Sequence, residues 1–376
     1  MFTAGLPNFG DEFITRAWLQ YLAKHRPDDD VWLDCSNPGH ASILFRGIHP
    51  NLHIVNTLWQ LVWNTRHLID NQARAALAIE GWIRHGGTPR EDLGIDLLRD
   101  VDSIHFLGGG YVNQLWKANI LLFVAASAVK AINPSVSLHA TGLGLSPLEG
   151  ESLSLLHQAI SSFDTFTVRD EQSASLTGTT FTCDDAFLAF GKERNAWQDN
   201  KTDRSAFVCL QHDVIGENQS AIPKIVDSLL QSDVSYNEIL TVVEALPPDD
   251  AWALDSLREQ WKGKVELLPF SHLWNVGFPV STDAVWISSR FHTHLIAAAT
   301  RARGVAMEFG NDYYHIKHQS LLDLGTGWSV LDCSDPNNSA PSSHATKEDS
   351  FPQKAHSLFK QKSQEVTKIY DSSTQQ

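Results

Sequence analysis

The feature that most constrains the fold is an alternation of short β-branched runs with longer segments of helical periodicity, which occurs in two series along the chain. This alternation is typical of α/β proteins with parallel sheets. In the first series we expect strands at 31–35, 103–107, 136–141, 165–168 and 180–182. In the second we expect them at 206–211, 239–244, 265–268, 284–288, 305–309 and 329–331. A polar stretch at 191–204 indicates a linker between the two series.

We therefore predict two Rossmann-like α/β domains, over 1–195 and 196–335, whose sheets face each other across a cleft. Residues 336–376 form a polar tail, but helical spacing over 352–369 predicts a last helix that packs back onto the body. Before the first expected helix, at 11–24, only Phe2 to Ala4 are left to form a strand. Either the first strand is very short or the natural start lies upstream of Met1.

Composition narrows the class of function. Acidic residues outnumber basic ones by 44 to 29, for a net charge of −15, and such a surface disfavours nucleic acid and anionic lipid as partners. The four cysteines are far apart, which suits a reduced cytoplasmic protein better than a disulfide framework or a zinc site. The longest apolar stretch, 119–132, falls short of the roughly 20 residues that span a bilayer, so we expect no transmembrane segment.

The first candidate motif is Asn8-Phe9-Gly10-Asp11-Glu12 at a helix start. Asn8 suits an N-cap, and acids in the first turn suit the helix dipole, which accounts for Glu12. Asp11 has two equally good interpretations, because a carboxylate at this position could also orient or deprotonate a ligand hydroxyl.

Two further motifs follow strands of the first half. Gly109 and Gly110 belong to a glycine triplet after the strand that ends at Leu107, and such a turn can bring backbone N–H groups close to a ligand anion. Arg169 ends another strand, where it could clamp a carboxylate or a phosphate, whereas Asp170 is better explained as the cap of the next helix. The loop 141–144 is explained at least as well by a tight turn.

The most specific motif is Ser288-Ser289-Arg290-Phe291-His292-Thr293-His294. Arg290 stands on the turn after a strand and His292 lies in the first helical turn, so a fixed cation and a group that titrates near neutrality are predicted side by side. His292 and His294 are two residues apart on a helix and point in different directions, so they make no metal pair.

Two candidates lie further along the chain. Lys317, expected at a helix start, either neutralises a phosphate or is simply exposed. Glu308, at a strand end, either binds a ligand hydroxyl or pairs with a nearby cation.

Taken together, these motifs resemble the polysaccharide pyruvyl transferase family from Asn8 to about Leu331. The elements are Asn-x-Gly-Asp-Glu, the glycine triplet, a Gly-x-Gly-x-x-Pro loop, Val-Arg-Asp-x-x-Ser, the Asp184-Asp185 pair and Ser-x-Arg-Phe-His-x-His. The resemblance implies a fold like that of the two-domain GT-B glycosyltransferases.

The resemblance also implies the reaction. Members of the family transfer the enolpyruvyl carbons of phosphoenolpyruvate to two hydroxyls of one sugar, which forms a cyclic ketal and releases phosphate, with no metal or other cofactor strictly required. The acceptor would be a polysaccharide, a lipid-linked sugar or a glycolipid, so the protein could be peripheral to a membrane. Arg290 and Arg169 would hold the donor together with Lys317, Gly109 and Gly110. His292 would transfer the proton, Asp11 would face the acceptor hydroxyl, and Asn8 and Glu308 would contact the acceptor.

Two alternatives stay open. One keeps the fold but uses a sugar nucleotide as donor, and the other is a catalytically silent carbohydrate-binding protein. We expect His292→Ala and Arg290→Ala each to abolish activity and to leave the fold intact.

Overall fold

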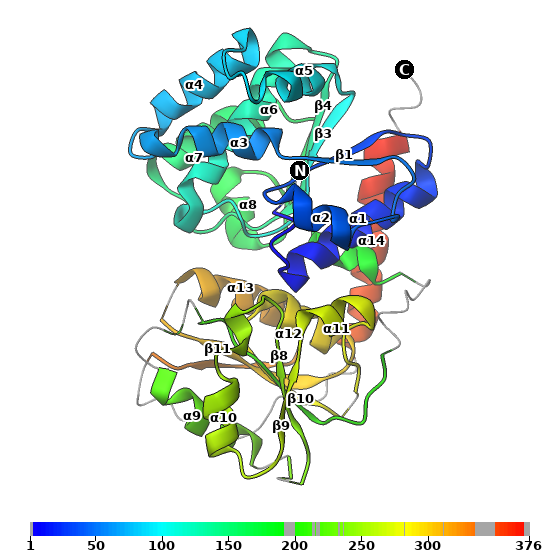
Figure 1. The fold of residues 1–376 in the computed structure, drawn as a ribbon, viewed down its shortest axis with the longest axis vertical. Helices are drawn as coiled ribbons and strands as arrows, with labels where there is room; N and C mark the ends of the chain where they lie inside the picture. The colour runs from blue at the N-terminus through cyan, green and yellow to red at the C-terminus, as the bar shows by residue number, and fades with distance from the viewer. Residues whose placement is uncertain are drawn as a thin grey trace. The chain divides into compact units, whose positions relative to one another are not determined.

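The computed structural model describes residues 3–191, 200–212, 215, 219–231, 234–235, 237–281, 283–310, 312–334 and 350–371. The chain forms two compact units (Figure 1). Unit 1 comprises Met1–Leu6, Asp11–Ala189 and Lys360–Gln376, and unit 2 comprises Pro7–Gly10 and Phe190–Phe359. The expected cleft between two facing sheets stays a prediction.

Unit 1 contains two parallel sheets. The smaller pairs β1 (Val31–Asp34) with β2 (Leu52–Val55). The larger has the order β3 (Ser103–Phe106), β4 (Ser137–Leu143), β5 (Thr165–Val168), β6 (Thr180–Phe181). Its described helices are α1 (Phe9–His25), α2 (Pro38–Leu44), α3 (Thr57–Asn64), η1 (Arg66–Leu68), α4 (Gln72–His85), α5 (Asp92–Asp100), η2 (Gln114–Ile120), α6 (Leu121–Ile132), α7 (Gly150–Ile160), α8 (Glu171–Thr177) and η3 (Asp185–Ala189).

The most apolar helix belongs to the core of unit 1. Eight of the twelve residues of α6 are buried, and the helix packs against α4 and α7. Within the described residues, Gln114–Ile132 is the one segment long and apolar enough to cross a membrane by length and composition. This segment is not one α-helix, however, because it begins as η2 with non-helical angles at Trp116. The twelve residues of α6 alone would extend about 18 Å, well short of a hydrocarbon core of about 30 Å.

Unit 2 is built on one six-stranded parallel sheet. Its order is β12 (Ser329–Asp332), β11 (Arg303–Glu308), β10 (Val285–Ser288), β7 (Ala206–Cys209), β8 (Leu240–Val243), β9 (Val265–Leu268). The described helices are α9 (Ile222–Leu230), η7 (Asp249–Ala251), α10 (Leu254–Gln260), α11 (Phe270–Asn275), α12 (Phe291–Ala299) and α13 (Asp312–Asp323). The chain starts at the centre with β7, proceeds outward to β9, and then crosses back to β10 on the other side of β7. This is the strand order of a Rossmann fold.

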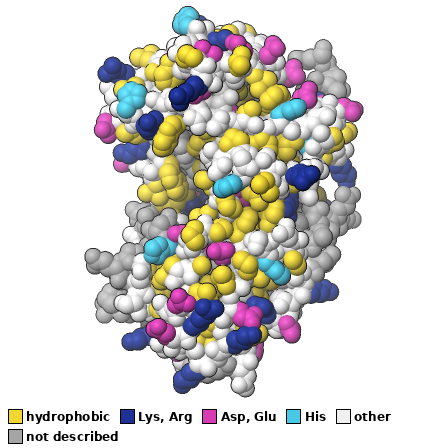
Figure 2. All heavy atoms as spheres, viewed as in Figure 1, with side chains coloured by type: hydrophobic (Ala, Val, Ile, Leu, Met, Phe, Trp, Pro, Cys, Tyr) yellow, Lys and Arg dark blue, Asp and Glu magenta, His cyan; other side chains and the backbone are white. Residues whose placement is uncertain are grey.

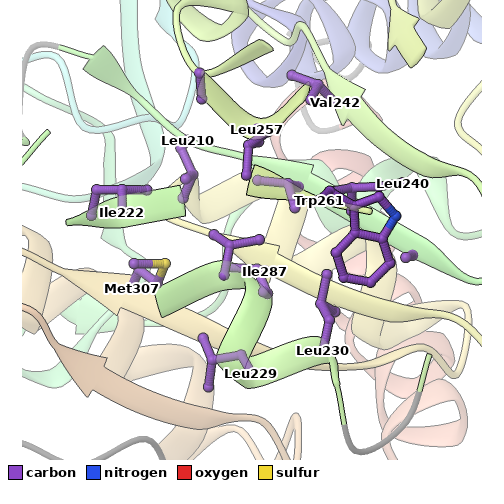
Figure 3. Close-up of a cluster of buried hydrophobic side chains, with 14 of the residues drawn as sticks. Leu210, Ile222, Leu229, Leu230, Leu240, Val242, Leu257, Trp261, Ile287 and Met307 are labelled. Carbon is purple, nitrogen blue, oxygen red and sulfur yellow. The ribbon is translucent and has the colours of Figure 1, made fainter. Parts of the chain in front are cut away.

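The core of unit 2 follows from this topology. The strands β7, β8 and β10 are buried along their whole length, as strands covered on both faces must be, and they read as continuous apolar runs. Side chains from α9 and α10 close over one face of the sheet (Figure 3). They include Ile222, Leu229, Leu230, Leu257 and Trp261. Each large apolar side chain of this kind stabilises the fold by about 1.5–3 kcal/mol when fully buried.

All eleven expected strands are confirmed, each within two residues of its expected ends. The strand β2 was not predicted; it is short and only partly buried, so its apolar pattern is weak. The short strand expected at Phe2–Ala4 is wrong where it can be judged, because Thr3 and Ala4 lie in a bend and a turn. Phe2 lies outside the described residues.

The last helix is α14 (Phe351–Asp371). Its Lys362 is fully buried and forms ion pairs with Asp185 at 2.9 Å and with Glu365 at 2.6 Å. Near the end of α14, the hydroxyl of Tyr370 lies 3.0 Å from Nδ1 of His105 on β3. The C-terminal half of α14 therefore belongs to the interior of unit 1.

The face drawn in Figure 2 carries basic side chains scattered among acidic ones, and on its described part they do not gather into one patch.

Candidate functional site

The topology of unit 2 marks one position for a ligand. In open α/β sheets, ligands bind beyond the carboxyl ends of the strands, at the point where the strand order reverses. Here that point lies between β7 and β10, and β10 ends at Ser288, directly before Ser289 and Arg290. Arg290 is the residue before α12, which begins at Phe291. The sequence motif with Arg290 and His292 therefore stands at the switch point.

Arg290 is held in a buried ion pair. Its Nε donates to both carboxylate oxygens of Asp250, at 3.0 and 2.9 Å, and its Nη2 donates to Asp250 at 2.6 Å. Nη2 also reaches Asp249 at 3.0 Å. Burial opposes the charge of Arg290, but the two aspartates outweigh it and raise its pKa, so the side chain stays a guanidinium. Arg290 is thus a rigidly oriented cation whose charge is already countered.

Asp250 also fixes the neighbouring loop. Its Oδ2 accepts the backbone N–H groups of Ala245 and Leu246, at 3.0 and 2.9 Å. The carbonyl oxygen of Ala245 in turn accepts the N–H of Phe9 at 2.8 Å, and the ring of Phe9 stacks on Phe278 with centroids 5.9 Å apart. The segment Pro7–Gly10 is accordingly part of unit 2, although it opens the chain.

This attachment brings two motifs together that are far apart in the sequence. A Cβ atom built on Gly10 would lie 2.2 Å from Nδ1 of His292 and 2.9 Å from its Cβ. The imidazole therefore lies directly on the backbone of Gly10, where only glycine leaves room for it. His292 is half-buried, with its ring perpendicular to that of Phe291.

Behind this turn, two buried histidines form a hydrogen-bonded chain. Nδ1 of His294 lies 3.1 Å from Nδ1 of His318, Nε2 of His318 lies 3.2 Å from the carbonyl oxygen of Ser289, and Nε2 of His294 lies 2.9 Å from the hydroxyl of Thr326. Because a carbonyl only accepts, His318 carries its proton on Nε2, and His294 donates from Nδ1. Burial lowers the pKa of His318 to about 4 and that of His294 well below its usual value. Both rings are neutral and support the backbone beside Arg290.

Helix α13 contacts three strand ends of unit 2. Besides His318 against Ser289, its Tyr314 accepts a hydrogen bond from Gln211, just beyond β7, at 2.9 Å. Its His315 lies 2.9 Å through Nδ1 from Glu308, the last residue of β11. Of the two possibilities for Glu308, the structure shows the pairing with a nearby side chain.

Lys317 was expected at a helix start, and this is wrong, because α13 begins at Asp312 and Lys317 lies in its second turn. The ammonium of Lys317 lies over the ring of Tyr313, with Nζ 3.6 Å from the centroid. The contact is a cation–π interaction that orients the lysine.

In unit 1, Arg169 follows β5 and is also buried among carboxylates. Its Nη1 donates to Asp184 at 2.8 Å, and Asp170 lies 3.9 Å from its Nε. Gly144 leaves room for this guanidinium, since a Cβ there would lie 2.5 Å from Nε. Asp170 accepts the N–H of Ser173 at the start of α8, as predicted for a cap.

The first residue of the glycine triplet of unit 1 contacts an anion that belongs to the chain. The N–H of Gly108 donates to Asp185 at 2.8 Å, and a Cβ on Gly108 would lie 2.9 Å from the carboxyl carbon. The same oxygen accepts from Trp18 and Thr141, both at 2.8 Å. The carbonyl oxygen of Gly109 accepts a hydrogen bond from the backbone N–H of Gly144, and that of Gly110 accepts one from the side-chain amide of Asn113. Gly108 therefore serves the buried Asp185, and a ligand role for Gly109 and Gly110 stays a prediction.

The opening motif divides between the units. Asn8 directly precedes α1 and is half-buried, and Asp11 accepts a hydrogen bond from Thr3 at 2.9 Å. Glu12 is fully buried and accepts the N–H of Gly5 at 2.8 Å. Burial raises the pKa of Glu12 to about 8, so this carboxyl group is largely protonated at pH 7.

Sequence reasoning missed three residues that matter. Asp249 and Asp250 carried a signal, since two acids follow a strand end after Pro247-Pro248. Lys362 carried none, because a lysine on an amphipathic helix is normally exposed. Among the described residues, no group of three or more His, Cys, Asp or Glu side chains is placed to hold a metal ion.

The fold and this turn define a class: an α/β protein with parallel sheets that places an Arg-Phe-His turn at the switch point of a Rossmann-type sheet. A family model described as polysaccharide pyruvyl transferase matches residues 8–310. The chain therefore belongs to this family.

Other comparisons add little. No curated protein matches the chain. One similar solved structure is Os79 from O. sativa in complex with U2F and trichothecene, at 12% identity and a TM-score of 0.46, with 95% of each chain covered. A likeness this distant carries no conclusion about function.

Proposed function

We propose that the protein transfers the enolpyruvyl carbons of phosphoenolpyruvate to a pair of hydroxyls on one sugar of a polysaccharide or glycolipid, with formation of a pyruvate ketal and release of phosphate. The observation that carries the proposal is the turn at the switch point of unit 2, where His292 lies on Gly10 and Arg290 is held by Asp250.

The residue types suit the reaction. Protonation of the methylene carbon of the donor creates an oxocarbenium-like centre, and a protonated imidazole is a suitable acid for this step. We assign that role to His292. Cations stabilise the departing phosphate, and we assign Arg290 and Lys317 to it.

The ion pairs of Arg290 suggest how the donor binds. Arg290, Asp249 and Asp250 together carry a formal charge of −1, which by itself repels an anion. Asp249 touches the guanidinium through one contact of 3.0 Å and its side chain is 24% exposed, whereas Asp250 is fully buried. We infer that the donor's phosphate or carboxylate displaces Asp249 and meets a guanidinium that Asp250 still orients.

The test is a turnover assay with phosphoenolpyruvate and candidate acceptors. We expect release of inorganic phosphate, with each product heavier than its acceptor by one pyruvate less one water. Release of a nucleoside diphosphate from a sugar nucleotide instead would replace the proposal with glycosyl transfer. Acceptor binding without turnover of either donor would indicate a silent carbohydrate-binding protein.

A further inference from the structure

A second candidate for proton transfer lies on the same sheet edge of unit 2. Glu308, the last residue of β11, is 4% exposed, and its Oε2 lies 2.9 Å from Nδ1 of His315. The side chain of His315 is 60% exposed. The pair is thus a buried carboxylate bound to an imidazole that faces solvent.

With Glu308 ionised, its hydrogen bond sets the tautomer of the histidine. An ionised carboxylate only accepts hydrogen bonds, so Nδ1 of His315 carries the proton and the lone pair stays on Nε2. Burial raises the pKa of Glu308 and the nearby Asp332 adds to this shift, whereas the hydrogen bond from His315 lowers it. A carboxylate in this position also stabilises the imidazolium that forms when Nε2 takes up a proton. The same relation between a buried aspartate and a histidine makes that histidine a base in hydrolytic triads.

The pair is placed at the strand ends that carry the Arg-Phe-His turn. The strands β10 and β11 are neighbours, and Ser288 of β10 lies opposite Ala306 of β11. Arg290 follows Ser288 by two residues and Glu308 follows Ala306 by two residues, so Arg290 and Glu308 are at the same level of the sheet. Helix α13 is fastened to this edge on both sides of His315. Tyr314 bonds to Gln211 beyond β7, and His318 bonds to Ser289 beyond β10.

We propose that His315, positioned by Glu308, is the general base that takes the proton from the attacking hydroxyl of the acceptor. The assignment rests on the proposed function. It gives the hydroxyl proton to this pair, in place of the role that the sequence suggests for Asp11.

The proton balance of the reaction closes with such a group as a relay. As the first hydroxyl oxygen bonds to C2 of phosphoenolpyruvate, its proton passes to Nε2 of His315, and the methylene carbon receives a proton from His292. The bond between C2 and the phosphate oxygen then breaks, with its electron pair leaving on phosphate. The second hydroxyl oxygen bonds to C2, and its proton passes to the departing phosphate. Transfer of a proton from His315 to His292 through solvent restores both residues, so no net proton is consumed.

The first experiment compares His315→Ala, Glu308→Gln and Asp11→Asn with wild type in the phosphate-release assay. His272→Ala is the matched control, since His272 is an exposed histidine of the same unit, on α11. We expect His315→Ala to lower kcat by about 100-fold or more, as loss of a general base does, with KM for phosphoenolpyruvate unchanged and part of the rate restored by added imidazole. Glu308→Gln should lower kcat by a smaller factor. A rate close to wild type in His315→Ala overturns the proposal. If His315→Ala stays active and Asp11→Asn loses most of its rate, with no rescue by imidazole, the base is Asp11 instead.

A second measurement does not depend on turnover. In ¹⁵N-labelled protein, we expect His315 to be protonated on Nδ1 in wild type and to lose this preference in Glu308→Gln. A wild-type ring protonated on Nε2 overturns the proposal even if phosphate is released. If the tautomer is as expected but no phosphate is released, the proposed function is overturned instead. If the protein then releases nucleoside diphosphate from a sugar nucleotide and His315→Ala loses this activity, His315 is still the base, but for a different donor.

Discussion

The imidazole of His292 lies on the backbone of Gly10, so closely that a methyl group on Gly10 would be 2.2 Å from Nδ1. The two residues are separated by most of the chain, yet they belong to one compact unit. The contact packs the backbone of Gly10 against the Arg-Phe-His turn.

Gly10→Ala should therefore displace His292 and lower kcat for phosphate release by about 10-fold or more, a loss typical of a misplaced reacting group. The comparison is Gly81→Ala on α4, where an added Cβ meets nothing within 4 Å. That variant should keep full activity and gain up to about 1 kcal/mol in free energy of unfolding. Equal activities in the two variants would contradict a role for the contact.

Arg290 and Asp250 should be strongly coupled in stability. Removal of either partner leaves a buried charge uncompensated, so Arg290→Met and Asp250→Leu should each lower the free energy of unfolding by about 3–5 kcal/mol. The double variant should lose less than the sum of both, as urea unfolding would measure. Additive losses would show that the pair does not interact. Arg290→Ala should likewise lower stability, whereas the sequence alone suggests only that this variant leaves the fold intact.

The pair of Asp185 and Lys362 should hold the last helix on unit 1. Lys362→Met leaves Asp185 buried without its cation, and we expect a loss of about 3–5 kcal/mol. In Lys362→Met, amide hydrogen exchange should be faster than in wild type over residues 360–371 and unchanged over the strands of unit 2. Protection of this segment as strong as in wild type would refute the assignment. Lys360→Met, two residues earlier on α14 at an exposed position, is the control.

Stability should fall on acidification because of the buried histidines. The pKa of His318 is about 4 in the fold against 6.5 unfolded, so the unfolded state binds more protons between these values. The contribution is complete above pH 6.5 and is lost as the pH falls toward 4, by up to about 3 kcal/mol. In His318→Gln the decline of unfolding free energy over this range, measured by urea titration at each pH, should be shallower. An unchanged slope would show that His318 is not buried in neutral form.

Glu12 should act in the opposite direction. Its folded pKa of about 8 lies above the ordinary value of 4.5, so the fold binds more protons than the unfolded chain between these values. Stability from this group is complete below pH 4.5 and is lost as the pH rises through 8. Relative to wild type, Glu12→Gln should gain stability from about pH 5 to 8, and the difference should level off above pH 8. A constant difference would mean that Glu12 is ionised in the fold.

The residues by themselves determined the class of fold, the strands and the position of the Arg-Phe-His turn. Apolar runs such as Ala206–Cys209 and Val285–Ser288 can hide their side chains only in a sheet covered on both faces, and a helix that begins at Phe291 follows from the change of period. The local sequence pattern is sufficient to predict these strands and this helix start, because each depends mainly on residues that are close in the sequence.

The interaction partners of these side chains were decided by the tertiary structure alone. Nothing near Arg290 in the sequence identifies Asp250 as its counterion, nothing near His292 identifies Gly10, and Lys362 looks like any exposed lysine of an amphipathic helix. Strand order brings these residues together, and the energy of a buried charge or a close packing contact depends on atoms that the chain supplies from distant segments. The positions of the reactive groups thus follow from the sequence, whereas the fold determines which of them are paired, which are neutral and which are exposed.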